Sequence, residues 1–344
     1  MPAAPSPTPR VSVGLPVYDG ARYLPQTLAD WTRQTYADFE LVVVDNASTD
    51  GTEALCRAAA AEDARIRYVR NARNIGALPN ANRAFALARG ELYALSAHDD
   101  RHAPDFLAQL VAALDDDPGA VLAYGDQTLV GADGAPFAFD ADARVYRDAA
   151  GAVYDYDAAL QRPMPDDPVA RFRAVLRATD INAPIHGLFR RDVAARVGPH
   201  QIWGSDRLIV AHAALLGRFA FVDAPLFAYR IHAGSTVHLD RQSWMQRDTG
   251  RADAGSVLDP VRSMARYLGA VRDAPLDPRQ RLAAASAVLG RAVGTQVAGQ
   301  ALLPGPDNYW GWTGRASAEG DAGGDALGAR PPRQRWSWLA GDDS

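Results

Sequence analysis

Short apolar runs alternate with amphipathic stretches through residues 11–100 of the chain. Runs of strand type, two of them rich in β-branched residues, begin at Val11, Phe39, Ile66 and Leu92. Stretches with apolar residues at helical spacing lie between them, at 21–35, 53–61 and 77–88. This alternation predicts βαβ units, and therefore an α/β fold with a Rossmann-like, mainly parallel sheet and helices on both faces.

Polar residues follow three of these strands directly, at Pro16–Tyr18, at Asp45–Ser48 and at His98–Asp100. In open α/β sheets, ligands bind beyond the carboxyl ends of the strands. We therefore group the three segments into one predicted site.

The most informative of the three segments ends in the adjacent carboxylates Asp99 and Asp100. Two neighbouring charges at the end of a buried strand are unfavourable unless a positive group lies beside them. Mn²⁺ or Mg²⁺ carrying a diphosphate meets that need, since both ions prefer oxygen ligands. The alternative is that the pair only caps the helix that begins near Pro104.

Composition excludes several classes of function. No GxGxxG or GxxxxGK[ST] motif follows the first strand, which disfavours a dinucleotide-binding Rossmann domain and a P-loop. The net charge of −5, without any run of basic residues, gives no attraction to nucleic acid. The single cysteine, Cys56, excludes an intrachain disulfide and a cysteine metal cluster.

The second half of the chain has a weaker pattern. Residues 138–168 are interpreted as a long loop or insertion, 171–178 and 208–217 as helices, and 219–222 and 226–231 as short strands. Residues 255–303 have helical periodicity. The expected organisation is a flexible N-terminus (1–9), one α/β domain (10–240), a helical C-terminal extension (241–304) and a flexible tail (305–344) that contains several tryptophans.

Several motifs, taken in order, resemble the family-2 glycosyltransferases of the GT-A fold. The resemblance covers roughly residues 10–125 and continues more weakly to Thr236. It implies inverting transfer of a sugar from a nucleotide-diphosphate-sugar to a hydroxyl of a polysaccharide, a lipid-linked glycan or a small natural product. The motifs are Val13–Gly20, Val43–Thr52, Asn74–Gly76, Asn82, Ala88–Glu91, His98–Asp100, Asp206 and Tyr229–His232.

The resemblance assigns the nucleotide-binding residues. Pro16 and Tyr18 match the loop around the base, and Asn74 and Gly76 match the loop beside base and ribose. Asp45 and Asn46 match a pair, usually Asp-Asp, that accepts the N–H of uracil or thymine, which favours a UDP- or dTDP-sugar. Asn46 replaces the second carboxylate, and Asp45 as a helix cap remains an alternative, as does Asn82 as a packing residue.

The resemblance also assigns the metal and the catalytic base. The usual first aspartate of the metal motif is replaced by Ala97. Asp99 is then expected to bind the ribose or the metal, Asp100 to bind the metal, and His98 to be structural. His232 is expected to reach the metal or diphosphate, with Arg230 as an anion partner, although a structural histidine is an equal alternative.

Asp206 matches the general base that deprotonates the acceptor hydroxyl. Because it begins a predicted helix, the helix dipole would keep it ionised and therefore basic. The alternative is that Asp206 only caps the N-terminus of this helix.

Two rival functions remain. A nucleotidyltransferase would need a glycine-rich phosphate loop and a lysine, and the chain contains neither. A catalytically degenerate sugar- or nucleotide-binding protein is suggested by Ala97 and Asn46. Without a signal peptide or a run of ~18 apolar residues, the expected location is cytoplasmic, which permits peripheral association with the membrane. The oligomeric state is not predicted.

Overall fold

The computed structural model describes residues 8–140, 143, 145–155, 163–178, 182–198, 205–235, 259–297 and 337–339. Four parallel strands form the first half of its main sheet: β1 (Val11–Val17), β2 (Phe39–Asp45), β3 (Ile66–Arg70) and β4 (Leu92–Leu95). Helices α1 (Leu24–Thr32), α2 (Thr52–Glu62) and α3 (Ala77–Leu87) connect them. The predicted strand–helix alternation is confirmed.

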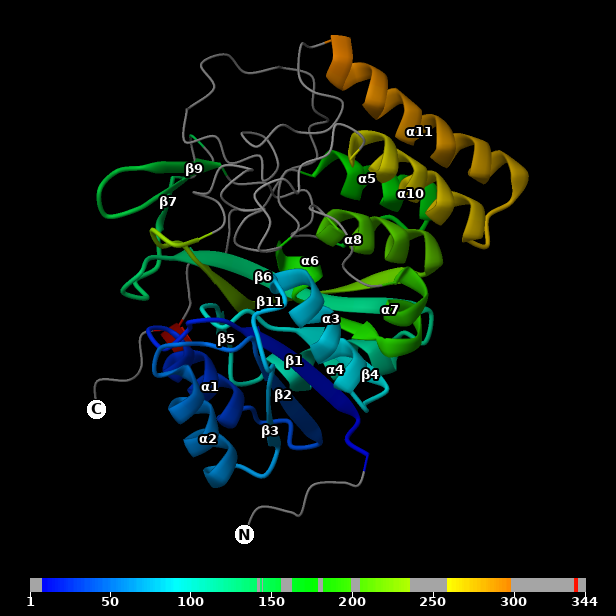
Figure 1. Cartoon of the computed structure of the whole chain (residues 1–344). Coiled ribbons are helices and arrows are strands. Elements are labelled where there is room, and N and C mark those ends of the chain that lie inside the picture. The colour runs from blue at the N-terminus through cyan, green and yellow to red at the C-terminus, as the bar shows by residue number, and fades with distance from the viewer. Residues whose placement is uncertain are drawn as a thin grey trace.

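The main sheet has eight strands in the order β3-β2-β1-β4-β10-β6-β11-β5 (Figure 1). β6 (Ala120–Val130) pairs in parallel with β11 (Arg218–Arg230). β10 (Leu188–Arg190) lies antiparallel between β4 and β6, and β5 (Arg101–His102) pairs antiparallel with β11 at the edge. The α/β prediction is correct, and beyond the first four strands the sheet is mixed.

Two segments differ from the sequence-based expectation. Residues 138–155, expected as a loop, contain a small antiparallel sheet of β7 (Ala138–Asp140), β8 (Val145–Arg147) and β9 (Val153–Asp155). Aromatic residues from this insertion pack on the ends of β6 and β11, which gives the short strands a hydrophobic face. The two strands expected at 219–231 are one long strand, β11, whose register shifts near Pro225.

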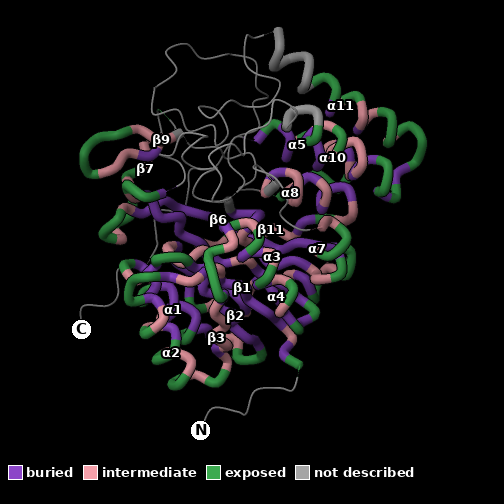
Figure 2. The backbone as a smooth tube through the Cα atoms, in the orientation of Figure 1, coloured by how far each residue is buried: buried purple, intermediate pink, exposed green. Residues whose placement is uncertain are grey.

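Helices cover both faces of the sheet. On one face, residues of β1 and β2 pack against α1 and against α4 (Phe106–Asp116). On the other, α3 packs on β2, while α5 (Pro168–Arg177), α6 (Asn182–Ile185), α7 (Arg191–Val197) and α8 (Ser205–Leu216) pack around β6. Figure 2 shows the strands as a buried layer between the helices.

The C-terminal part adds α10 (Asp259–Asp273) and α11 (Pro278–Val297), which stack on α8 and α5 (Figure 1). A short 3₁₀ turn, η4 (Ser337–Leu339), returns to the main sheet, where the Trp338 indole donates a hydrogen bond to the Pro225 carbonyl. The rest of the expected flexible tail lies outside the described residues. Across the part of the chain that is described, no helix combines the length and hydrophobicity needed to span a membrane.

Candidate active site

The candidate site lies where β1, β2, β4 and β11 end. β1 and β2 run side by side in register to Val17 and Asp45, so the segments that follow them are neighbours. A backbone hydrogen bond joins Asn46 to Val17, and the Ser48 hydroxyl accepts one from the Asp19 backbone. Parallel alignment thus brings distant sequence motifs together, as expected at the carboxyl edge of an α/β sheet.

Asp45 is fully buried and engaged within the chain. One carboxylate oxygen accepts the Ser48 backbone N–H at 2.8 Å, and the other accepts from the Tyr68 hydroxyl at 2.6 Å and from Arg70. Burial acts to raise the pKa of Asp45, but these hydrogen bonds outweigh it and leave the pKa below its ordinary value. Asp45 therefore stays ionised and fixes the segment that follows β2.

Asn46 is the centre of a buried amide network. Its side-chain oxygen accepts from Asn71 and from the Ile75 backbone, and its amide donates to Asn74 at 2.7 Å. Asn71 in turn donates to Asn80 of α3. The network holds the predicted base-side loop 71–76 against the end of β2. Asn71 and Asn80 were missed in the sequence, where isolated asparagines carry no pattern.

The remaining predicted nucleotide-binding positions border this network. Pro16 pairs with Val44 near the end of β1, and the Tyr18 side chain is 37% exposed beyond it. Gly76 precedes α3 with a φ of +91° and donates its N–H to the Asn74 side chain. That backbone conformation favours glycine, because a Cβ would clash with the chain.

Asp99 and His232 form a pair between the ends of β4 and β11. His232 Nδ1 accepts the Gly234 backbone N–H at 3.1 Å, so the ring proton is on Nε2 and is donated to Asp99 Oδ2 at 3.0 Å. Both side chains keep some exposure, 19% for Asp99 and 13% for His232. Burial would raise the pKa of Asp99, but the neighbouring His98 and His232 hold it below its ordinary value.

Asp100 points the other way, into the protein, with only 1% exposure. Its Oδ1 accepts the Arg230 backbone N–H at 2.9 Å, and its Oδ2 has no hydrogen-bond partner among the described residues. Burial, together with the charge of Asp99, raises the pKa of Asp100 well above its ordinary value. The adjacent carboxylates therefore have different surroundings, and Asp99 is the one that faces a polar partner at the site.

Arg230, predicted to be an anion partner, donates its hydrogen bonds to groups within the protein. Its guanidinium donates to the Asp99 backbone carbonyl at 2.6 Å, to the Gln26 side chain at 2.7 Å and to the carbonyls of Gly131 and Ala132. It is 1% exposed and lies over the Tyr23 ring. In this arrangement Arg230 ties the loop that carries Asp99 to β11, α1 and the turn after β6.

His186 is close to the predicted site, although the sequence only indicated a structural or solvated residue. Its Nδ1 donates to the Leu95 carbonyl at 2.9 Å, which places its Nε2 4.0 Å from Asp100 Oδ2. Its ring stacks on Phe227. The apolar run around residues 181–189 hid this position, because the run predicts burial and no chemistry.

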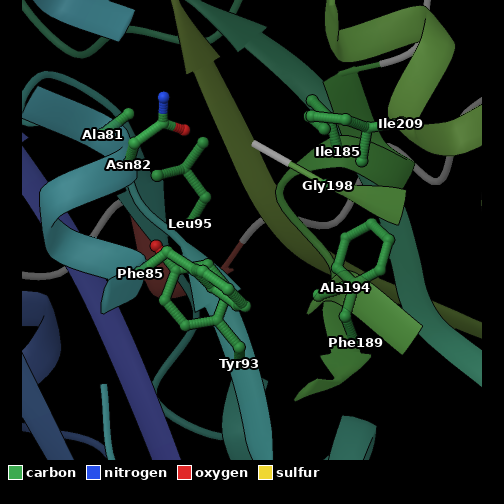
Figure 3. Close-up of a pocket in the computed structure, with 10 residues that line it drawn as sticks. All are labelled: Ala81, Asn82, Phe85, Tyr93, Leu95, Ile185, Phe189, Ala194, Gly198 and Ile209. Carbon is green, nitrogen blue, oxygen red and sulfur yellow. The ribbon is translucent and has the colours of Figure 1, made fainter. Parts of the chain in front are cut away.

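Asp206 lies in the first turn of α8. A cavity of about 50 Å³ is lined by Leu95 of β4 and by Ile209 of α8, one turn after Asp206 (Figure 3). Ile185, the neighbour of His186, lines the same cavity. The beginning of α8 and the end of β4 therefore face one another across a small apolar space.

Comparison with known proteins agrees with this geometry. Residues 12–132 match the family described as glycosyl transferase family 2. Glycosyltransferase GlyG of Streptococcus pneumoniae is 31% identical over 26% of this chain and 30% of its own length. An uncharacterized glycosyltransferase of Nostoc is 27% identical over 72% of each chain. For the first curated relatives, this chain spans only 10–39% of their length.

A solved structure shares the fold. Staphylococcus aureus TarS, crystallised with UDP-GlcNAc, superposes with a TM-score of 0.59 at 15% identity, over 83% of this chain and 73% of the TarS chain. The mixed sheet, the helices on both faces and the family match of residues 12–132 agree with one another. Residues 12–132 therefore belong to glycosyltransferase family 2, and the chain has a GT-A fold.

Proposed function

We propose that this protein transfers a sugar, with inversion, from a nucleoside-diphosphate-sugar to a hydroxyl of an acceptor, with the help of a divalent cation. The observation that supports this most directly is the Asp99–His232 pair between the ends of β4 and β11. The relatives include proteins named for colanic acid and teichuronic acid biosynthesis, which makes a polysaccharide or lipid-linked acceptor the first to test.

Asp99 and His232 could hold a cation together with the diphosphate of the donor. Asp99 Oδ2 and His232 Nε2 face each other at 3.0 Å with a single proton between them, and a cation could replace that proton. Within the residues described, no cluster of three or more acidic, histidine or cysteine side chains could hold a metal. Mg²⁺ is commonly bound by one or two carboxylates together with substrate phosphates, so two protein ligands suffice.

Mn²⁺ or Mg²⁺ bound there would offset the negative charge of the departing diphosphate. Asp100 as a further ligand remains a proposal, and it would require the buried carboxylate to turn outward. In its present orientation Asp100 accepts the backbone N–H of Arg230, two residues before His232, and so helps to position the Asp99–His232 pair.

Asp206 is proposed as the general base. A carboxylate within hydrogen-bond reach of the acceptor hydroxyl takes its proton while that oxygen attacks the anomeric carbon from the face opposite the leaving diphosphate. The position of Asp206 in the first turn of α8 favours the ionised form, since the helix dipole stabilises negative charge there.

The donor is proposed to be a uridine or thymidine diphosphate sugar. TarS binds UDP and UDP-GlcNAc according to its crystal structures. Pro16, Tyr18, Asn74 and Gly76 would surround the base and ribose. Asp45 and Asn46 already bond within the chain, so we propose that they shape the base-binding loop and that the base meets groups this network positions.

The decisive experiment measures UDP released from UDP-sugars by the purified protein with Mn²⁺. A transferase releases UDP slowly by hydrolysis and faster with an acceptor, and the rate should fall at least ~100-fold in Asp99→Asn and in Asp206→Asn. A protein that only binds sugar nucleotides would bind UDP without releasing it from any donor, which would contradict the proposal. Asp116→Asn, an exposed change on α4, is the matched control.

A further inference from the structure

The small cavity lined by Leu95 and Ile209 has a mostly apolar lining among the described residues. It lies between α3 and β4 on one side and α6, β10, α7 and α8 on the other (Figure 3). Asn82, at one end of the cavity, is the lining residue with an amide side chain among those the structure describes. Ala81 of α3 and Ala194 of α7 also line the cavity.

The Tyr93 hydroxyl, the other polar side-chain group among the described lining residues, is directed toward β1. A Cβ placed at Gly14 would lie 2.2 Å from that oxygen, so the phenol end occupies the space that glycine leaves. The hydroxyl is buried without a hydrogen-bond partner among the described residues. A sugar ring in the cavity would leave most of its hydroxyls unpaired, whereas an alkyl group would lose nothing.

The volume limits the size of the occupant. At about 50 Å³, the cavity is much smaller than the ~150 Å³ apolar cavity that holds benzene in an engineered protein. A complete aromatic ring or a long lipid chain is therefore too large for it. The end of a branched alkyl group, of isopropyl size, is the chemistry that matches both the lining and the volume.

The position of the cavity indicates that its occupant would be part of the acceptor. Ile209 follows Asp206 by three residues on α8, a rise of about 4.5 Å along the helix, and Leu95 lies just before the loop that carries Asp99. If Asp206 is the base, a group in the cavity would lie within about one helical turn of it along α8. Four of the six contributing elements, α6, β10, α7 and α8, also lie outside the family-matched residues 12–132.

We propose that this cavity is an acceptor subsite that receives a compact branched alkyl group attached close to the reacting hydroxyl. The assignment to the acceptor depends on the proposed transferase function, whereas recognition of the alkyl group depends only on the cavity. Filling the cavity should therefore impair use of the acceptor while donor affinity remains unchanged.

The binding test uses isobutanol as the probe and glycerol as a polar probe of similar size, with saturation-transfer NMR on the full chain. Isobutanol should give a signal that disappears in Ala194→Leu, which fills the cavity from α7, and in Ala81→Leu, which fills it from α3. Ala195→Leu, an exposed change at the next position of α7, is the matched control and should keep the signal. An equal signal from glycerol, or one that survives both filling variants, would overturn the subsite.

The acceptor test compares methyl and isobutyl glycosides of glucose, galactose and mannose as acceptors, measured by UDP release. The isobutyl compounds should be preferred at least ~10-fold in kcat/KM, the usual discrimination of an apolar pocket, and Ala194→Leu should abolish the preference without changing the affinity for UDP. Weaker UDP binding in Ala194→Leu would contradict the acceptor assignment. Absence of UDP release from wild type, with isobutanol binding retained, would instead contradict the transferase function.

Discussion

At the scale of single residues, the two neighbouring carboxylates show how surroundings assign different roles to identical groups. Asp99 is hydrogen-bonded to His232 at the surface of the site, and its pKa is low. Asp100 accepts a backbone N–H inside the protein, and its pKa is high. At neutral pH Asp99 is therefore ionised, as the proposed cation site requires, while Asp100 fixes the backbone of Arg230.

Asp206→Asn tests the proposed base. The amide keeps the size of the side chain but cannot accept a proton, so kcat should fall at least ~100-fold while the affinity for the nucleotide, measured by calorimetry, stays the same. Asp192→Asn, in the first turn of α7, is a matched change at another helix start and should leave both values unaltered. Turnover close to that of wild type would remove Asp206 from catalysis.

His102 offers a test of stability. It is buried against Trp31 and Phe106, and neither ring nitrogen has a hydrogen-bond partner among the described residues. Replacement by phenylalanine keeps the shape and removes two unsatisfied polar atoms, so the free energy of unfolding should rise by about 1–2 kcal/mol. Thermal unfolding at pH 8 would measure the gain, and a loss of stability would contradict this account of the site.

His102 should also make the stability of the folded protein depend on pH. Burial, together with His186 and Arg101, depresses the pKa of His102 far below its ordinary value. The unfolded chain binds a proton below pH ~6.5 that the folded protein does not, so wild type should lose stability as the pH falls below that value. His102→Phe should lose less between pH 7 and pH 5. Parallel curves for the two proteins would show that His102 does not contribute.

At the scale of elements, α1 supports the loop that carries the site. Asp30 of α1 receives hydrogen bonds from the Arg101 guanidinium at 2.6 Å and 3.0 Å and from the His102 backbone at 3.1 Å. The Thr27 hydroxyl donates toward the backbone carbonyls of His98 and Asp100. Hydrogen bonds with α1 therefore hold segment 98–102, which connects β4 to β5.

Asp30→Ala should therefore be strongly destabilising. It leaves the guanidinium of Arg101 buried without its partner, which costs about 3–5 kcal/mol of unfolding free energy. Denaturant unfolding would measure the loss, with the exposed Asp38→Ala as the control, expected within ~0.5 kcal/mol of wild type. A similarly small effect for Asp30→Ala would mean that the ion pair does not hold the loop.

Element patterns also explain what the sequence could predict. β1, β2 and β4 are largely buried and apolar, and β3 alternates apolar residues with arginines, so the residue pattern located the four strands within a few residues. The insertion 138–155 was missed because its strands are only three residues long and gain stability from aromatic contacts with β6 and β11. The long β11 was divided in prediction because Pro225 interrupts the pattern at its irregularity.

The candidate site, like the fold, was only partly predictable from the sequence. Motif positions predicted Asp99, Asp100 and His232 as site residues, and the resemblance favoured Asp100 as the metal ligand, whereas the structure turns Asp100 inward. The partners of Arg230 come from segments far apart in the chain, and a side chain that is buried among carbonyls resembles an anion-binding arginine in sequence. Asn71 and Asn80 enter the site only because α3 folds back on β2.

At the scale of the whole molecule, the candidate site joins a part that matches the family and a part that lies outside the match. The side proposed for the nucleotide comes from residues 12–132, which match the family. The side proposed for the acceptor comes from α6, β10, α7 and α8, which in turn pack against α10 and α11.

The proposed cation site at Asp99 and His232 can be tested by the affinity of UDP for the full chain, measured by calorimetry with Mn²⁺ and with EDTA. If the pair holds the cation, Mn²⁺ should tighten UDP binding at least ~10-fold, a coupling of about 1.4 kcal/mol. Asp99→Asn and His232→Gln should remove this gain, while Asp116→Asn keeps it. If Mn²⁺ improves UDP binding equally in all four proteins, or in none, the Asp99–His232 pair does not hold the cation and the central claim is wrong.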